Sequence, residues 1–372
     1  MRFPEFEGEW KKEQLGDTAD FSKGAGISKE QLSEKGEPCI LYGELYTKYK
    51  SEVIYDIISK TDIDSTKLVR SQANDVIIPS SGETAEDIAT ARCVLKNNIL
   101  LGGDLNIIRL HNHSGSFMSY QLNGKRKYDI AKVAQGVSVV HLYAEHLKGV
   151  NTYNPCMEEQ EKIARLLSLL DERIATQNKI IEDLKKLKSA ISLKMLHSDS
   201  WEQFRIKDIA IIGRGRVISS VEISQQKNPT YPVYSSQTSN EGIMGYLDDY
   251  MFEGEYISWT TDGANAGTVF YRNGRFNCTN VCGLLKLKKG FDTHFVSLVL
   301  AEATKKYVSV NLANPKLMNN TMGNIQICLP KLEEQKRISI VFRRLHELLA
   351  IHNNLLTEYS KQKQYLLSQM FI

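Results

Sequence analysis

Two short loops place glycine beside a basic side chain, and these are the residues most suited to chemistry with an anion. They are Lys23-Gly24 and Arg214-Gly215-Arg216. Glycine lets a backbone approach a ligand closely, and an arginine fork can hold a phosphate or the edge of a guanine. The alternative is a turn between strands with its charge left in water. Both loops are candidate nucleic-acid contacts.

Further clusters of polar and aromatic side chains could contact the same kind of ligand. Hydroxyl and amide groups suit base edges or phosphates, and a carboxylate can accept from cytosine N4. Each of these residues taken singly can also be an ordinary turn residue. The candidates are Tyr42, Glu44, Tyr46, Thr47, Ser80, Ser81, Gly82 and Thr84 in the first part of the chain, and Ser235, Ser236, Gln237, Thr260, Thr261 and Gly263 in the second.

The sequence offers little for catalysis or metal binding. Asn-Pro-Thr-Tyr at 228–231 lacks the second proline of an adenine-methyltransferase signature, and no P-loop is present. His111 and His113 lack a third ligand at a telling spacing. We therefore predict no catalytic residue, no metal and no cofactor in this chain.

Composition fits a two-domain protein of the cytoplasm. The chain has 372 residues, 24% of them charged, and a mild net charge of +3, which permits nucleic acid as a partner without demanding it. Its 6 cysteines form no Cys-x-x-Cys pair, so a reducing compartment is expected. The sequence shows no signal peptide and no run apolar enough to span a membrane.

Two copies of one helical sequence are among the elements that must position the candidate residues. A shift of 175 positions places Pro155 on Pro330 and the Glu-Glu-Gln of 158–160 on that of 333–335. Both copies start after proline, carry acidic residues in the first turn and run without Gly or Pro to the end of the match. Each copy is therefore predicted to be one long helix.

Apolar residues in both helices recur in steps of four and three, which indicates a left-handed coiled-coil seam. The seam is polar at the same two places in each copy, Gln177 with His352 and Lys188 with Lys363. Polar seam residues cost stability and can fix the register. Alternatively Lys188 reaches out to solvent while Leu187 fills the seam.

A second repeat precedes each helix and sets the domain limits. A shift of 191 positions places Trp10 on Trp201 and Gly24 on Gly215. The chain therefore reads globule, helix, globule, helix. We place the first globule at 1–153, the first helix at 154–197, the second globule at 198–328 and the second helix at 329–372.

Chain length decides how the helices pair. Residues 158–196 as a helix would be roughly 58 Å long. The second globule joins the end of one helix to the start of the other, and a body of its size is only about 36 Å across. Parallel pairing would require it to bridge the whole helix, so we expect antiparallel pairing, with one globule at each end and a pseudo-twofold relation.

The globules read mainly as short strands with some helix. Runs at 74–84, 98–110, 255–263 and 281–290 are rich in β-branched and apolar residues between turn residues. The runs at 86–95 and 295–308 have a helical pattern. The predicted fold class is α+β, with two mixed α/β globules separated by a long antiparallel two-helix coiled coil.

This arrangement resembles the specificity subunits of type I restriction-modification systems. The resemblance rests on the duplicated Pro-x-x-Glu-Glu-Gln-x-x-Ile helices and the Trp-led globules, and it covers essentially the whole chain. Residues 40–49 and 231–246 also look like segments of that family's target-recognition domains. It implies that each globule reads one half of a split DNA site, while the helices form the spacer.

The resemblance also implies partners. Two modification subunits would dock on the spacer and methylate adenine with S-adenosylmethionine, and restriction subunits would add an ATP-dependent nuclease. S-adenosylmethionine, ATP and Mg²⁺ would then belong to the partners. We expect the helix starts to serve structure and docking, through Glu158, Glu159, Gln160, Glu333, Glu334 and Gln335.

A different class of function stays open from the residues alone. The chain could be a coiled-coil scaffold whose two globules bind proteins. Salt separates the two hypotheses, because affinity for DNA falls steeply as salt rises.

Overall fold

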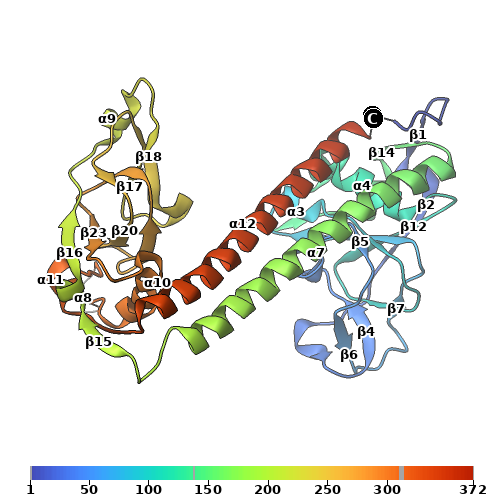
Figure 1. The fold of residues 1–372 in the computed structure, drawn as a ribbon. Helices are drawn as coiled ribbons and strands as arrows, with labels where there is room; N and C mark the ends of the chain where they lie inside the picture. The colour runs from blue at the N-terminus through green and yellow to red at the C-terminus, as the bar shows by residue number, and fades with distance from the viewer. Residues whose placement is uncertain (1, 137–138, 310–313, 372) are drawn as a thin grey trace. The chain divides into compact units, whose positions relative to one another are not determined.

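The structure is a computed structural model that describes residues 2–136, 139–309 and 314–371. The chain forms two units. Unit 1 comprises Met1–Ile180 with His352–Ile372, and unit 2 comprises Ile181–Ile351. Two long helices pass through both units, α7 (Met157–Met195) and α12 (Leu332–Gln369), shown in green and red in Figure 1.

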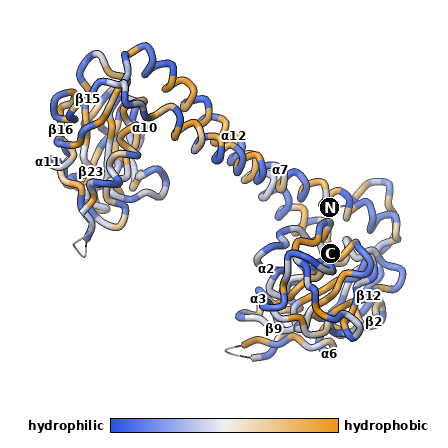
Figure 2. Tube along the Cα trace, turned by 90° about the horizontal axis from the view of Figure 1, so that it is seen from below, coloured by the Kyte–Doolittle hydropathy of each residue, from blue (hydrophilic) through white to orange (hydrophobic). Residues whose placement is uncertain are grey.

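The long helices pair in opposite directions, as predicted. In unit 1, Ile163 and Leu167 near the start of α7 share a core with Leu366 and Met370 near the end of α12. In unit 2, Ile191 near the end of α7 packs into the same core as residues near the start of α12. Hydrophobic and hydrophilic residues alternate along both helices (Figure 2), as expected for elements buried on one face.

Unit 1 is built on two five-stranded sheets. One has the order β2-β12-β8-β10-β5 and the other β3-β6-β4-β11-β7. The strands are β1 (Lys11–Gln14), β2 (Ala19–Lys23), β3 (Leu32–Ser33), β4 (Glu37–Ile40), β5 (Val53–Ile54), β6 (Ser59–Thr61), β7 (Val69–Arg70), β8 (Asp75–Pro79), β9 (Ser81–Gly82), β10 (Arg92–Val94), β11 (Leu100–Leu101), β12 (Leu105–Leu110), β13 (Val140–His141) and β14 (Asn151–Asn154). Its short helices are α1 (Leu15–Thr18), α2 (Glu44–Thr47), α3 (Ala85–Ile88), α4 (Gly115–Asn123), α5 (Lys127–Val133) and α6 (Ala144–Lys148).

Unit 2 has two four-stranded sheets, ordered β16-β23-β20-β21 and β18-β17-β22-β19. The strands are β15 (Glu202–Arg205), β16 (Ala210–Arg214), β17 (Tyr231–Tyr234), β18 (Ile243–Leu247), β19 (Phe252–Glu253), β20 (Tyr256–Thr260), β21 (Val269–Arg272), β22 (Arg275–Cys278), β23 (Cys282–Leu287) and β24 (Gln326–Leu329). Its helices are α8 (Ile206–Ile209), α9 (Ser220–Ser224), α10 (Thr293–Ala303) and α11 (Asn319–Asn324).

The topology repeats between the units. β2-β12-β8-β10 corresponds to β16-β23-β20-β21, with every neighbouring pair antiparallel in both. The parallel pair β4-β11 corresponds to the parallel pair β17-β22. Within each unit, the strand that follows the leading tryptophan pairs with the strand just before the long helix. The repeat read from the sequence is thus also a repeat of strand pairing.

One local prediction was wrong. The run 86–95 has a helical pattern, but only Ala85–Ile88 is helix and Arg92–Val94 is strand β10. β10 lies between β8 and β5, and all its residues are buried. Pairing on both edges and burial outweigh the weak local helix preference of so short a run.

Each long helix is fastened to its globule by the glutamine of Glu-Glu-Gln. Gln160 donates from Nε2 to the Pro155 carbonyl at 2.9 Å, and its Oε1 accepts from the Ser114 amide at 3.0 Å. Gln335 makes the same two bonds, to the Pro330 carbonyl at 2.8 Å and from the Asp292 amide at 3.0 Å. The second bond reaches the residue that caps α4 in unit 1 and α10 in unit 2.

Candidate nucleic-acid interface

In unit 1 the three clusters predicted from the sequence meet at one turn, Gly102–Asp104. The Ala25 amide, next to Lys23-Gly24, donates to the Leu101 carbonyl at 3.0 Å. The Gly102 amide donates to the Ile40 carbonyl at 2.9 Å, and the Ser80 amide donates to the Asp104 carbonyl at 2.7 Å. The backbone therefore joins the glycine loop to the segments that carry Tyr42 and Ser81.

Unit 2 repeats this junction at the turn Thr279–Val281. The Arg216 amide donates to the Cys278 carbonyl at 3.1 Å, and the Thr279 amide donates to the Tyr234 carbonyl at 2.9 Å. The Thr261 amide donates to the Val281 carbonyl at 3.3 Å. These three bonds match the three of unit 1 one for one. We call the two regions junction 1 and junction 2.

Close approach explains the glycine in each basic loop. A Cβ on Gly24 would lie 2.0 Å from the Gly102 carbonyl oxygen, and a Cβ on Gly215 would lie 1.6 Å from the Cys278 carbonyl oxygen. Real contacts of that kind are not this short, so a side chain at either position would push the loop off its turn. Glycine serves here to bring two backbones together.

The side chains around the two turns differ. Junction 1 borders a cavity of about 790 Å³, whose lining includes Gly26, Tyr42, Thr47, Lys48 and Asp104. At junction 2, Arg214 donates from Nε to Asn319 Oδ1 at 2.9 Å, and the exposed Asn280 lies in the turn itself. The same backbone frame therefore presents two different sets of polar groups.

The basic residues of the two loops lie at the edges of their sheets. Lys23 is exposed at the end of β2, with its Nζ 5.9 Å from the ring centroid of Tyr143. Arg214 is half-buried at the end of β16. The exposed Arg216 forms a two-point pair with Glu222, and this hydrogen bonding raises the pKa of Arg216 and lowers that of Glu222. Arg216 is thus held in place by its own chain.

Several candidate residues face inward. Glu44 is buried and accepts hydrogen bonds from the Leu41 amide, the Lys48 ammonium and Ser59. Thr260 and Thr261 are buried, with their hydroxyls donating to the carbonyls of Asn265 and Val281. These bonds hold the junctions together.

The other candidates lie on or near the surface. Tyr42 and Thr47 are exposed, while Ser81 and Gly82 form the half-buried strand β9. Burial raises the pKa of the Tyr46 hydroxyl, so this group remains neutral. The hydroxyl lies 3.5 Å from the Ser81 carbonyl oxygen. Ser80 is buried, and Thr84 caps α3 by accepting from the Asp87 amide at 3.1 Å. In unit 2, Ser235, Ser236 and Gln237 are half-buried after β17, and Gly263 has a φ of +90°.

Arg272 is a residue that sequence reasoning missed. Its guanidinium carbon lies 3.6 Å from the ring centroid of Tyr234, and it donates to Ser258 Oγ at 2.9 Å and to the Glu241 carbonyl at 2.7 Å. Burial lowers the pKa of Arg272. It therefore fastens the loop that carries Ser235 and Gln237 to the sheet beneath. One arginine in a strand gives no local sign of this role.

The helix starts differ in exposure between the units. Glu158, Glu333 and Glu334 are exposed, whereas Glu159, Gln160 and Gln335 are buried. Glu159 receives two hydrogen bonds from the guanidinium of Arg2, at 2.8 and 2.7 Å.

The two histidines considered for metal binding have other partners. His111 Nε2 lies 2.8 Å from Asp20 Oδ2, and His113 Nδ1 lies 3.0 Å from Gln160 Nε2. Across 2–136, 139–309 and 314–371, no group of three or more His, Cys, Asp or Glu side chains is placed to hold a metal ion. In the same ranges, no helix has both the length and the apolar character needed to cross a membrane.

The chain contains two globules of like topology, and each is fastened to a long helix. Both globules have the same backbone junction with different side chains around it. These features define a duplicated recognition protein. Residues 7–186 and 198–359 match the family described as the type I restriction modification DNA specificity domain, so the chain belongs to that family. It is a subunit for DNA sequence recognition, and the family is non-catalytic.

Individual proteins agree with this membership. Over 198 residues the chain is 38% identical to a putative type I specificity subunit of Mycoplasma pneumoniae, covering 52% of this chain and 82% of that one. It is 43% identical over 150 residues to the type I restriction enzyme MpnII specificity subunit of the same organism, covering 40% and 44%. The crystal structure of a type I system S subunit from M. genitalium has the same fold, with a TM-score of 0.75, 18% identity and coverage of 100% and 99%.

Proposed function

We propose that the chain reads a bipartite, asymmetric DNA site, with one half read at junction 1 and the other at junction 2. The observation that carries this proposal is the repetition of one backbone frame with different side chains. Two readers of the same build and different chemistry suit two unlike half-sites. The remaining candidate residues line or support these junctions, and phosphate contacts would set position while base-edge contacts set sequence.

In this proposal the helices α7 and α12 set the gap between the half-sites. An α-helix of 39 residues is roughly 58 Å long, and half-sites read on one face of DNA lie about 34 Å apart per helical turn. The proposed divisions are the globules 1–153 and 198–328, with 154–197 and 329–372 as spacers.

The proposal includes partners in the cytoplasm. Two modification subunits would dock on the spacer near the helix starts, where Glu158 and Glu333 are exposed, and restriction subunits would complete the assembly. S-adenosylmethionine, ATP and Mg²⁺ would be bound by those subunits.

Mapping adenine methylation across the genome of cells that carry this chain and its partners tests the proposal. We expect one split motif with a fixed gap. Inserting one heptad into both helices should lengthen the gap without altering either half. A continuous motif, or a gap that ignores the insertion, would contradict the model.

A further inference from the structure

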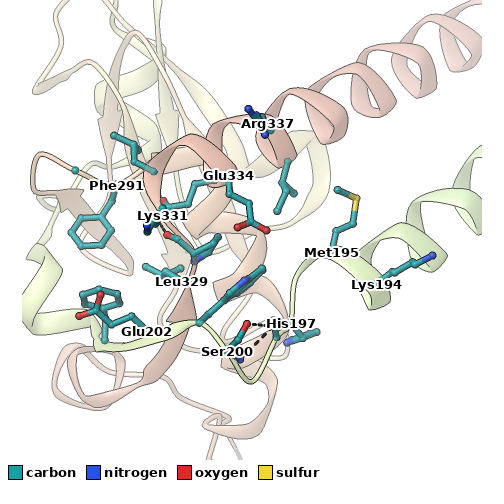
Figure 3. A pocket seen from close by; sticks show the side chains of 18 residues that line it. Lys194, Met195, His197, Ser200, Glu202, Phe291, Leu329, Lys331, Glu334 and Arg337 are labelled. Carbon is teal, nitrogen blue, oxygen red and sulfur yellow. Dashed lines mark hydrogen bonds between the residues drawn. The ribbon is translucent and has the colours of Figure 1, made fainter.

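Unit 2 has an open cavity of about 940 Å³ at the point where α7 ends and α12 begins. Its walls are partly apolar, with Met195, Trp201, Phe291 and Leu329 among the lining residues, and it is of a size that can hold a few side chains. Figure 3 shows the carboxylate of Glu334 pointing from α12 into the space above the segment that carries His197 and Ser200. None of the residues that form junction 2 lines this cavity.

Two charged residues that line this cavity, Glu334 and Arg337, form no ion pair with another described residue. Glu334 and Arg337 are exposed, one turn apart on α12. Within the described residues, neither side chain has a salt bridge or a hydrogen bond. An acidic and a basic side chain therefore border an apolar cavity, and neither has an ion-pair partner among the described residues.

The internal repeat shows what fills the equivalent place in unit 1. There Glu334 corresponds to Glu159, Arg337 to Lys162 and Trp201 to Trp10. The segment Arg2–Glu9, which we call the arm, covers this place, and the cavity left beside it is about 460 Å³. The arm has no equivalent in unit 2, where residues 196–200 lead directly from α7 to Trp201.

The arm makes a specific set of contacts. Arg2 grips Glu159 through Nε and Nη2, and the Glu159 side chain is fully buried as a result. Glu5 forms an ion pair with Lys162. The Lys162 ammonium also lies 4.6 Å from the ring centroid of Phe3 and 5.8 Å from that of Phe6. The charged side chains at the start of α7 are thus paired by groups of the arm: one arginine, one carboxylate and two aromatic rings.

We propose that the cavity of unit 2 binds a segment of a partner protein that has the chemistry of the arm. The segment would carry an arginine for Glu334, a carboxylate three residues later for Arg337, and aromatic side chains that cover Arg337 and enter the apolar hollow. A bidentate arginine–carboxylate pair and a cation over an aromatic ring give such a site specificity as well as affinity. This proposal stands apart from DNA reading, since it uses a different surface.

The test uses a fluorescent peptide with the sequence of residues 1–9, Met-Arg-Phe-Pro-Glu-Phe-Glu-Gly-Glu, titrated with the full chain and followed by anisotropy. We expect saturable binding of one peptide per chain. Glu334→Gln should weaken binding about tenfold or more, because a charge-assisted pair is lost. A peptide with its arginine replaced by alanine should weaken to the same extent.

Glu347→Gln is the matched control, because Glu347 is exposed further along α12 and does not line the cavity. It should bind the peptide like the unaltered chain. Lack of saturable binding, or equal binding by Glu334→Gln, would overturn the proposal. Binding that is lost in Glu159→Gln and kept in Glu334→Gln would mean that the peptide displaces the arm, which also overturns it.

Self-association separates a partner protein from a second copy of this chain. Sedimentation of the unlabelled chain should show no association that depends on Glu334. If the chain forms dimers that both Arg2→Ala and Glu334→Gln abolish, then the occupant is the arm of another copy, and the proposed partner protein is wrong.

Discussion

Gln177 Oε1 lies 2.7 Å from His352 Nδ1, and these two residues occupy the same position of the internal repeat. Equivalent positions of two helices meet in this way when the helices run antiparallel about a point near that position. The two polar residues that interrupt the apolar seam therefore hydrogen-bond to each other. A polar seam pair of this kind favours one register over its neighbours at some cost in stability.

Replacing both Gln177 and His352 by leucine should raise the free energy of unfolding by about 1 kcal/mol, because two apolar seam residues then replace two polar ones. Each single substitution should change the free energy of unfolding less favourably than half the effect of the double substitution, because it leaves one polar side chain facing leucine. Denaturant unfolding of the unaltered chain, the two single variants and the double variant checks this. Additive effects of the two single substitutions would show that the pair is not coupled.

Gly215→Ala should lower stability by about 1–3 kcal/mol, because its Cβ would collide with the Cys278 carbonyl. Gly213→Ala, two residues earlier in β16, is the control, since a Cβ there meets nothing within 4 Å. Thermal unfolding measures both. Binding to DNA should fall for Gly215→Ala only, and equal behaviour of the two variants would remove the close approach from the explanation of junction 2.

Arg272→Leu should weaken recognition of one half-site and leave the other intact. The substitution removes the hydrogen bonds to Ser258 and Glu241 and leaves the buried Ser258 hydroxyl without its donor, at a cost of about 1–3 kcal/mol. Arg275→Leu is the control, because Arg275 is exposed and pairs with the exposed Glu253. Footprinting on DNA in which one or the other half-site is altered measures recognition of each half separately. Loss of recognition of both half-sites would contradict the model in which each globule reads one half.

Arg214→Ala should weaken binding to DNA of every sequence if Arg214 holds a phosphate. The dependence of log affinity on log salt should then flatten by about one unit. If Arg214 contacts a base instead, affinity should fall only for the cognate half-site. Titrations at several salt concentrations on cognate and scrambled duplexes separate these outcomes, and unchanged affinity on both duplexes would place Arg214 outside the interface.

Lys363→Met should destabilise unit 1 by about 3–5 kcal/mol. Lys363 bridges two buried carboxylates, Asp171 at 2.5 Å and Glu52, which lose their shared cation in the variant. Lys361→Met is the control, because Lys361 and its partner Glu358 are exposed. Its effect should stay within about 0.5 kcal/mol.

The loss caused by Lys363→Met should depend on pH. Burial raises the pKa of Glu52, while Lys363 acts to lower it. A carboxyl with a raised pKa in the folded state binds a proton more tightly folded than unfolded. It therefore destabilises the fold fully above the folded-state pKa, and this effect falls as pH drops below that pKa and disappears below the unfolded-state pKa. Without Lys363 the pKa rises further. The deficit should therefore be largest near neutral pH and shrink as pH falls toward 5, and a deficit that grows on acidification would refute this account.

The sequence alone determined the repeat, the two long helices, their antiparallel pairing and most of the strands. These features depend on periodicity, chain length and local turn chemistry, which a single sequence carries. It also supplied the candidate residues around the two glycine loops. Strand β10 was missed because its pairing partners, β8 and β5, lie elsewhere in the chain.

Tertiary structure decided which candidate residues lie at the surface and which are buried and support the backbone of the junctions. The turns Gly102–Asp104 and Thr279–Val281 join the clusters through backbone hydrogen bonds between distant segments, and such bonds leave no mark on side-chain type. Burial of Glu44 and Thr261 and the fastening role of Arg272 follow from packing between strands. Likewise Glu159 and Glu334 are identical in the repeat, and only the folded arm makes one buried and the other exposed.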